Sequence, residues 1–333
     1  MEKAVVSTAA DIRNVIAGVL ASKADKGGIK NVYCVACGGS LSCLYPMTYL
    51  IRSEAKTIWA ESITANEFVH ATPKALGENS LVFAMSLAGS TPETVAAAHV
   101  AKERGAAVIS LCAAYEVPLS EPADYTVYYR VELDRVWEQS NQAIILNLGF
   151  ELLHQLEEYP YYEDAMDAMK KLSSICAKAR EKVIPRALEW GKKMEKEPVI
   201  YTMGSGPSYY VSYMQCICMF MEMEWVHSNS IHCGEYFHGP FEITDRDTPF
   251  LVFVSDGRTR ALDERVLKFL RTYAEKVEIL DVKEYGINSI SDHVVEYFCC
   301  ILHWALGLEY AEGLAQAKQH PLMMRRYLGK VPY

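Results

Sequence analysis

Acidic and imidazole side chains gather in one apolar part of the sequence, residues 219–241. Glu222 and Glu224 stand between methionines and a tryptophan, and His238 precedes a Gly-Pro pair. A carboxylate among apolar neighbours has its charged form disfavoured, so its pKa rises toward the range of a general base. Imidazole titrates near neutrality and can donate a proton. The segment therefore predicts acid–base chemistry, with Glu222 as the base and His238 as the proton donor.

The same residues are equally compatible with structural roles. Glu222 and Glu224 are two residues apart and face different sides of a helix, so only one can enter a shared pocket, and we expect the other to be solvated. A structural arginine paired with Glu222 and a loop capped by His238 remain open alternatives. We expect His227 and His232 to be structural, because no HExxH spacing supports a zinc site.

Two loops rich in glycine and hydroxyl side chains, residues 37–40 and 86–94, follow predicted strands. In the second loop Pro92 suits a first helical turn, and Ser90 with Glu93 has the spacing of a capping box. The free N–H groups and the dipole of a helix N-terminus attract a phosphate. One such loop alone fits an ordinary capped helix better, whereas two at neighbouring strand ends predict phosphate binding. Neither loop has a Walker lysine or a Rossmann fingerprint, so a nucleotide is not indicated.

These loops sit in a pattern of short β-rich runs that alternate with longer helical runs, which predicts an α/β fold with parallel sheets. A mainly helical stretch is predicted over residues 135–196. The predicted strands cover residues 32–36, 57–60, 81–86, 107–111, 125–129, 199–203, 230–233, 250–254 and 277–280. Ligands in such sheets bind at the carboxyl ends of the strands, where both loops are expected.

The sequence also repeats itself. Residues 32–40 resemble residues 199–206, and residues 81–86 resemble residues 251–255 at a similar separation. Duplication of one α/β unit explains both matches. A chain of 333 residues also exceeds the usual single-core limit of about 250–300, which favours two domains.

Composition excludes several classes of function. The chain has 33 Lys plus Arg and 42 Asp plus Glu, a net charge of −9, which argues against nucleic-acid and anionic-membrane binding. The most apolar stretch, residues 209–226, contains two glutamates and is predicted to be a buried helix, not a membrane span. The N-terminal residues lack a signal-peptide pattern, so we expect a cytoplasmic protein with reduced cysteines, and Cys34 and Cys37 have no second close pair with which to bind zinc.

With these loops, the duplication and the run from Glu222 to Pro240, the sequence resembles the sugar isomerase (SIS) family, including the isomerase half of glucosamine-6-phosphate synthase. Within that family it is most similar to the fructoselysine-6-phosphate deglycases, in residues 234–244 and in the tail at residues 319–331. The resemblance implies two tandem SIS domains, residues 1–160 and 161–333. Each is expected to be a mainly parallel five-stranded sheet flanked by helices, a flavodoxin-like three-layer sandwich.

The resemblance also assigns the phosphate site. It implies that Ser40, Ser86 and Thr91 hold the sugar phosphate together with loop N–H groups at Gly39 and Gly89. The family usually has a serine at the third position of the second loop, where this chain has alanine at residue 88. One phosphate hydrogen bond is therefore expected to be missing.

In the same way the resemblance implies roles for the acid–base residues. Glu222 matches the catalytic glutamate, and His238 matches a ring-opening histidine that reaches the active site of the neighbouring subunit, so a homodimer with its active site at the subunit interface is expected, and a larger assembly stays open. The isomerase lysine falls at Met219 and is absent. The tail lysine of the family matches Lys330, with Lys318 as the alternative.

The function implied is deglycation. About thirty residues precede the first predicted strand, too few for a glutaminase domain, so isomerase chemistry would act on a preformed sugar–amine adduct. The expected reaction cleaves a 6-phosphorylated fructosamine to glucose 6-phosphate and a free amino acid, without a metal or organic cofactor. The alternatives are another SIS enzyme, such as an amino-sugar-phosphate deaminase or isomerase, and a non-catalytic phosphosugar sensor, which would not require Glu222 and His238.

Overall fold

The computed structural model describes residues 2–131 and 134–332. The chain divides into two compact units, Met1–Lys170 and Lys171–Tyr333. The α/β class with parallel sheets is confirmed in both units. The division into two SIS domains at residue 160 stays a prediction.

The first unit is built on a parallel five-stranded sheet in the order β2-β1-β3-β4-β5. Its strands are β1 (Asn31–Ala36), β2 (Trp59–Thr64), β3 (Ser80–Met85), β4 (Ala107–Cys112) and β5 (Tyr125–Tyr128). Every residue of β1, β3 and β4 is buried. Such continuous burial is typical of parallel strands with helices on both faces of the sheet.

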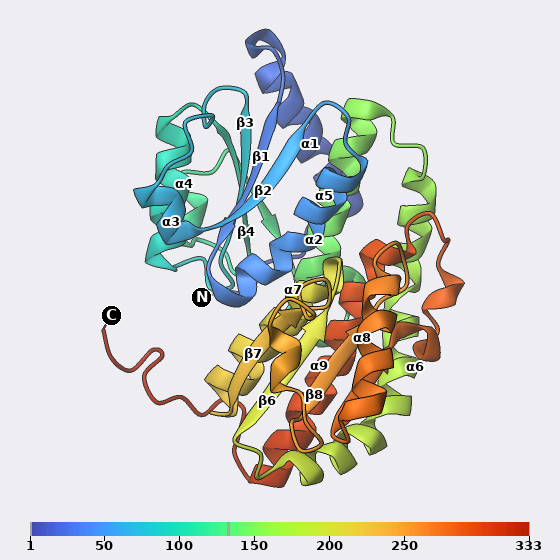
Figure 1. Cartoon of the computed structure of the whole chain (residues 1–333). Helices are drawn as coiled ribbons and strands as arrows, with labels where there is room; N and C mark the ends of the chain where they lie inside the picture. Colours follow the sequence, from blue (N-terminus) through green and yellow to red (C-terminus); the bar gives the residue numbers. More distant parts are fainter. Residues whose placement is uncertain (1, 132–133, 333) are drawn as a thin grey trace. The chain divides into compact units, whose positions relative to one another are not determined.

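Helices cover this sheet on both sides, with α3 and α4 on one face and α1, α2 and α5 on the other (Figure 1). The helices are α1 (Ala9–Lys23), α2 (Gly38–Glu54), α3 (Ala65–His70), α4 (Pro92–Glu103) and α5 (Asn141–Glu157), with short 3₁₀ turns at η1 (Ala24–Lys26), η2 (Pro118–Ser120) and η4 (Trp137–Gln139). Phe68 of α3 and Ala97 of α4 share a buried cluster with Tyr33 and Val82 of the sheet.

The second unit contains a parallel sheet in the order β7-β6-β8-β9. Its strands are β6 (Val199–Gly204), β7 (His227–His232), β8 (Phe250–Val254) and β9 (Val277–Asp281). Its helices are α7 (Pro207–Met214), the π-helix η5 (Gln215–Met223), α8 (Arg260–Tyr273) and α9 (Val295–Lys318), with 3₁₀ turns η6 (Pro240–Ile243), η7 (Val282–Tyr285) and η8 (Ile287–Ser289). Helix α6 (Tyr162–Met194) begins in the first unit and ends in the second.

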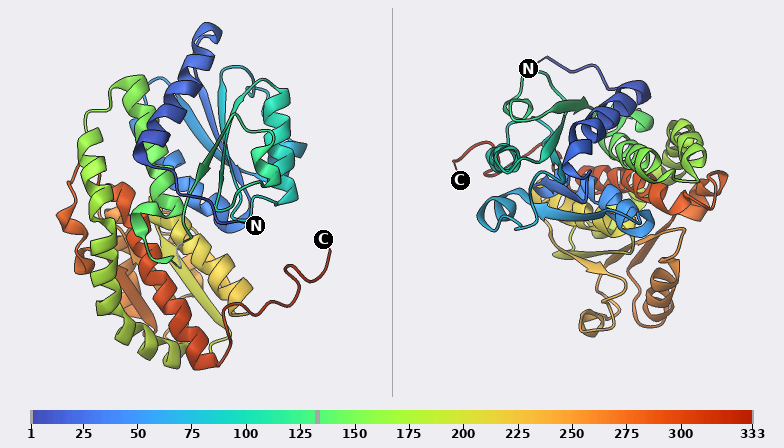
Figure 2. Two further views of the ribbon diagram at one scale, coloured as in Figure 1. Left: turned by 180° about the vertical axis from the view of Figure 1, so that it is seen from behind. Right: turned by 90° about the horizontal axis from the view of Figure 1, so that it is seen from above.

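Helix α8 packs on one face of the second sheet, and α7 and α9 lie together on the other, as the view from behind shows (Figure 2). Val266 and Leu270 of α8 share a buried cluster with Val252 and Val254 of β8. From the other face the imidazole of His303 in α9 bonds to the carbonyl of Leu280. Helices therefore cover the sheet on both faces.

The predicted five strands for the second unit are wrong, because the part of this unit that the structure describes has a four-stranded sheet. After β9 the chain forms the turns η7 and η8 and then enters α9, whose backbone is hydrogen-bonded within the helix. Two strands are also displaced from their predicted positions, since β2 and β7 begin at Trp59 and His227. Both are edge strands with many polar residues, so their hydrophobic pattern does not show clearly where each strand begins and ends.

Several expectations about the secondary structure are confirmed. The helical stretch predicted after residue 135 forms α5 and α6, and the apolar stretch at residues 209–226 forms α7 and η5. Within the described ranges no helix is both long and apolar enough to cross a membrane. The repeated sequence segments form corresponding strands, β1 with β6 and β3 with β8, and the first four strands of each unit follow the same order.

Candidate active site

The predicted phosphate loops follow two adjacent strands of the first sheet. Residues 37–40 lead from β1 into α2, and Ser86 comes directly after β3. The Ser86 hydroxyl is buried in the loop and lies 2.9 Å from the Thr91 hydroxyl. Parallel adjacent strands end at the same edge of a sheet, so both loops open at the carboxyl edge where α/β sheets bind ligands.

Backbone geometry explains the glycines of these loops. Gly38 and Gly89 have φ values of +54° and +64°, in the left-handed region that favours glycine. A Cβ atom at Gly89 would come within 2.3 Å of Val117, so a side chain cannot fit there. The Gly89 N–H donates to the Ser86 carbonyl at 3.0 Å within this turn, and its phosphate contact stays a prediction. Gly39 lies in the first turn of α2, where helix N–H groups lack partners within the helix.

The start of α4 differs in part from its prediction. Pro92 occupies the first turn, as expected, but Thr91 is the N-cap residue and its side chain makes no capping hydrogen bond, so the predicted capping box from Ser90 to Glu93 is wrong. The Thr91 hydroxyl instead faces that of Ser86. In the first turn of α4 the buried hydroxyl of Thr94 has no hydrogen-bond partner within the described residues. Unsatisfied donors at this helix end suit an anion.

In the second unit, Glu222 lies near the end of the π-helix η5. Helices of this type are rare and often mark functional sites. Glu222 lines a pocket of about 490 Å³ together with Trp225, His227 and the tail residues Arg325 to Leu328. Its Oε1 atom accepts a hydrogen bond from Nε of Arg325 at 2.8 Å. The arginine partner that the sequence left open is therefore present, and it comes from the tail.

Glu224 departs from the prediction that the second glutamate is solvated. It is 0% exposed, and neither carboxylate oxygen has a hydrogen-bond partner among the residues that the structure describes. Burial raises the pKa of Glu224 to about 7, and the charge of Lys318 opposes this shift. The helix ends at Glu224, and the chain reverses at Trp225, which has a φ of +55°. The apolar surroundings of this segment therefore raise the pKa of Glu224.

The histidines occupy different settings. His238 is exposed, its backbone N–H donates to the Glu235 carbonyl at 2.9 Å, and it precedes Gly239 with a φ of +130°. The ring nitrogen of His232 accepts the Gly234 N–H at 3.0 Å, as a structural residue would. His227, expected to be structural, is exposed and lines the pocket of Glu222.

The two candidate tail lysines contact backbone atoms. Lys330 is exposed, and its ammonium group donates to the carbonyl of Arg325. Lys318 donates to the carbonyl of Glu224 at 2.8 Å, and burial lowers the pKa of Lys318. A catalytic role for Lys330, or for Lys318 in its place, stays a prediction.

Sequence reasoning missed three side chains around Glu222, namely Trp225, Arg325 and Arg326. The guanidinium of Arg326 lies 4.0 Å from the centre of the Trp225 ring, a cation–π contact that holds the tail against the end of η5. The paired arginines in an otherwise apolar tail were a visible signal, but only the fold shows that they reach Glu222.

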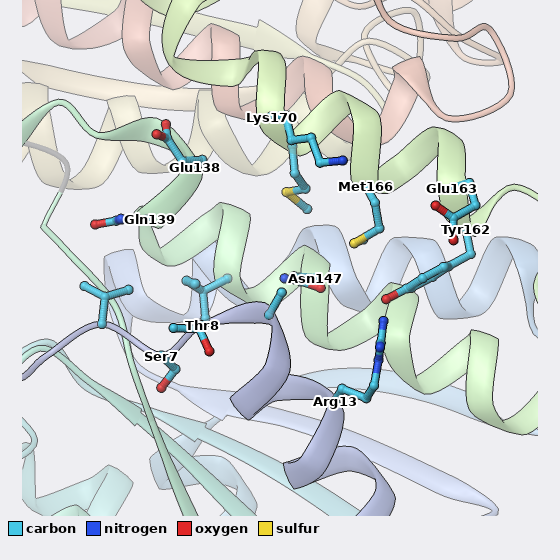
Figure 3. Close-up of a pocket in the computed structure, with 14 residues that line it drawn as sticks. Ser7, Thr8, Arg13, Glu138, Gln139, Asn147, Tyr162, Glu163, Met166 and Lys170 are labelled. Atoms are coloured by element: carbon cyan, nitrogen blue, oxygen red, sulfur yellow. The ribbon is translucent and has the colours of Figure 1, made fainter.

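A further pocket of about 540 Å³ in the first unit contains none of the predicted site residues (Figure 3). Arg13 of α1 points toward Tyr162 of α6, whose hydroxyl donates to the buried carboxylate of Glu151 at 2.5 Å. Nε of Arg13 lies 3.7 Å from the same carboxylate. These polar groups are satisfied by one another and hold the helices of the unit together. No group of three His, Cys, Asp or Glu side chains that could hold a metal ion occurs in residues 2–131 or 134–332.

Comparison with known proteins places this arrangement in a family. Residues 28–149 match the SIS domain. The chain is 39% identical to fructosamine deglycase FrlB of Bacillus subtilis over 305 residues, which cover 92% of this chain and 93% of that protein. The chain therefore belongs to the SIS-domain family.

Two more relatives refine this result. Fructoselysine 6-phosphate deglycase of Escherichia coli K12 is 25% identical over 78% of this chain and 75% of its own length. A crystal structure of a protein from Salmonella typhimurium LT2 superposes with a TM-score of 0.95 at 41% identity and covers 100% of this chain and 99% of that one. The resemblance to the deglycases of the SIS family is thus confirmed along nearly the whole chain.

Proposed function

We propose that this chain is a fructosamine-6-phosphate deglycase, which cleaves a fructose–amino acid 6-phosphate to glucose 6-phosphate and a free amino acid. The observation that carries the proposal is 39% identity to a fructosamine deglycase along 92% of the chain. The geometry supports it independently in each unit. The first unit has an edge suited to a phosphate, and the second has a carboxylate in an open pocket.

The substrate phosphate binds at the carboxyl edge of the first sheet. Ser86 and Thr91 donate from their paired hydroxyls, and Ser40 with the N–H groups of the first turn of α2, Gly39 among them, donates from the neighbouring loop. Hydrogen bonds to a charged phosphate are roughly twice as strong as neutral ones. The phosphate therefore anchors the substrate without a metal ion.

The chemistry is proton transfer followed by hydrolysis. His238 assists opening of the sugar ring, and Glu222 removes a proton from C1 to give an enolamine. Return of the proton at C2 leaves an imine between C1 and the amino nitrogen. Water then adds to C1, the C1–N bond breaks, and glucose 6-phosphate and the amino acid leave. A general base within reach of its proton contributes about 10²–10⁴-fold to such a step.

The protein acts as a homodimer of chains with two tandem SIS domains, and His238 serves the active site of the partner subunit. Support for this arrangement comes from the exposure of His238 on a turn and from the common strand order of the two units. A histidine that protrudes in this way can reach across an interface. Size-exclusion chromatography with light scattering tests the dimer, and a monomer at assay concentrations would contradict it.

The test of the proposed function is a coupled assay for glucose 6-phosphate, run on a panel of 6-phosphofructose amino acids beside glucosamine 6-phosphate. We expect release from at least one adduct, with the amino acid formed in equal amount. Ammonia from glucosamine 6-phosphate with no release from the panel would make the protein a deaminase. Binding of the substrates without any product would make it a sensor.

A further inference from the structure

An arginine of the C-terminal tail is hydrogen-bonded to the predicted catalytic base. Arg325 donates from Nε to Oε1 of Glu222 at 2.8 Å, across 103 residues of sequence. The arginine side chain is 13% exposed and that of the glutamate 32% exposed. A pair shielded to this degree is less weakened by water than a surface ion pair.

Arg325 is itself fixed by its surroundings. Its guanidinium also donates to the carbonyls of Leu322 and Met324, and its own carbonyl accepts from the ammonium group of Lys330. Three of its contacts are therefore to or from the backbone of its own tail. Such contacts hold a long side chain in one conformation before any substrate arrives, which reduces the entropy lost when it acts.

The tail that carries Arg325 is anchored on both sides of it to the segment around Glu222. Before it, Lys318 bonds to the carbonyl of Glu224, and the ring of His320 packs edge-on against Trp225 with 4.4 Å between the ring centres. On the C-terminal side of Arg325, the guanidinium of Arg326 stacks over the same Trp225 ring. Figure 2 shows the tail leaving the end of α9 and passing the end of η5.

The contact with Glu222 uses only one carboxylate oxygen. Oε1 accepts from Arg325, and within the described part of the chain Oε2 accepts no hydrogen bond. A bidentate arginine, which is frequent in pairs with carboxylates, would occupy both oxygens. Here one oxygen is held and the other is left for a proton.

We propose that Arg325 is a positioning residue for the deglycase reaction, which orients the Glu222 carboxylate so that Oε2 meets the C1 proton of the substrate. A glutamate has three side-chain torsions, and one on a partly exposed helix end samples several rotamers. A base displaced by about 1 Å loses about 10²-fold in rate. This role rests on the proposed function of Glu222 and adds to it a residue on which proton removal depends.

The inference is tested in the full-length protein with Arg325→Ala and Arg325→Lys, beside the matched control Arg246→Ala, whose arginine is exposed and pairs with Glu275 on the surface. Initial rates of glucose 6-phosphate release give kcat and KM with ordinary and C1-deuterated substrate. We expect Arg325→Ala to lower kcat about 10²-fold with a KM within about threefold of wild type, because the phosphate anchor is elsewhere. The control should keep both constants.

Two further readouts separate positioning from a general loss of structure. The kinetic isotope effect at C1 should increase in Arg325→Ala, because slower proton removal becomes rate-limiting, and millimolar guanidinium should restore part of kcat where equal sodium chloride does not. Arg325→Lys should fall between wild type and Arg325→Ala, and it keeps the test valid if the alanine variant does not fold.

Several outcomes would overturn the inference. Turnover of Arg325→Ala equal to or above wild type would show that the arginine does not position the base. A rise in KM alone, or a loss of kcat without a larger isotope effect, would assign Arg325 to substrate binding or to folding. If the wild-type protein releases no glucose 6-phosphate, the proposed function fails and the role of Arg325 fails with it. This outcome is read from the wild-type protein alone, so it is distinct from a failure seen only in the variants.

Discussion

The two units of the chain share the order of their first four strands but differ in what fills the loops at the strand ends. In the first unit, Ser86 follows β3 and faces Thr91, and among the described residues no acidic side chain is bonded to either hydroxyl. In the second unit, Ser255 follows β8 in the corresponding place. There a buried carboxylate, Asp263 from the first turn of α8, occupies the loop.

Asp263 accepts from the Ser205 hydroxyl at 2.6 Å, and from the N–H and hydroxyl of Ser255 at 3.0 Å and 2.9 Å. Ser205 lies in the loop after β6, which is the counterpart of the loop after β1. The donors that would bind a phosphate are thus already used, and a bound anion would meet a like charge. Under the proposed function, the loop after β3 is open to an anion, whereas the corresponding loop of the second unit is occupied by a carboxylate of its own chain.

The largest effect expected from this comparison is on substrate binding. Replacement of Ser86 by Ala together with Thr91 by Val removes two hydrogen bonds to a charged group, each worth about 1.5–3 kcal/mol, so KM should rise at least about 10²-fold. Ser255→Ala in the second unit should leave KM unchanged. Steady-state kinetics with one phosphorylated adduct provides the measurement. Equal effects of both changes would contradict the assignment of phosphate to the first unit.

The second unit has another buried carboxylate, Glu224, which differs from Asp263 because it lacks partners in the described residues. Its pKa of about 7 lies above the ordinary value of 4.5, so the folded protein binds more protons than the unfolded chain between these values. Its contribution to stability is therefore present at low pH and lost as the pH rises toward 7 and above, by about 3 kcal/mol at most.

Glu224→Gln should remove this loss. Urea unfolding at pH 5 and pH 8 should show a smaller decline in stability for the variant than for wild type, with the two differing more at pH 8. The corresponding amide at an exposed position, Glu275→Gln, should not alter the decline. A wild-type profile in Glu224→Gln would show that this carboxyl is not the source.

A smaller effect is expected when the closed loop of the second unit is disturbed. Asp263→Asn keeps the shape but exchanges one acceptor oxygen for an N–H₂ group that faces donors, which should cost about 1–3 kcal/mol of stability. Urea unfolding measures this loss. KM for the substrate should not change, and a lower KM would mean that the second unit also binds the substrate phosphate.

The smallest effect concerns the open loop itself. Ala88 is exposed in the loop after β3. Ala88→Ser offers one more donor to the phosphate, so KM should fall by up to about tenfold, the equivalent of about 1.4 kcal/mol. A KM that does not change would show that residue 88 points away from the phosphate.

Local chemistry allowed much of this structure to be predicted. The Gly, Ser and Pro residues of the loops at Cys37 and Ser86 identify the ends of β1 and β3, since the residues that form a turn are adjacent in sequence. The edge strands β2 and β7 were displaced because their polar residues obscure the pattern. Five strands were expected in the second unit because the two units were assumed to be equal, whereas its described part has a sheet of four.

The candidate site was only half visible in the sequence, because its pairings join distant residues. Glu222 was identified from its apolar surroundings, but its partner Arg325 lies 103 residues further on. Likewise nothing near Ser205 in the sequence reveals that Asp263 uses its hydroxyl. The burial of Glu224 depends on where η5 ends and the chain reverses. Helical periodicity shows which residues share a face of a helix, but it does not show which face the rest of the fold covers.

The most direct test of the proposed catalytic base is Glu222→Gln, assayed for release of glucose 6-phosphate from an adduct that the wild-type protein cleaves, with Glu275→Gln as control. We expect a loss of kcat of about 10²–10⁴-fold, while glucose 6-phosphate still binds the variant with wild-type affinity because the proposed phosphate loops lie in the first unit. Turnover like that of wild type in Glu222→Gln would contradict the assignment of this carboxylate as the base that removes the C1 proton.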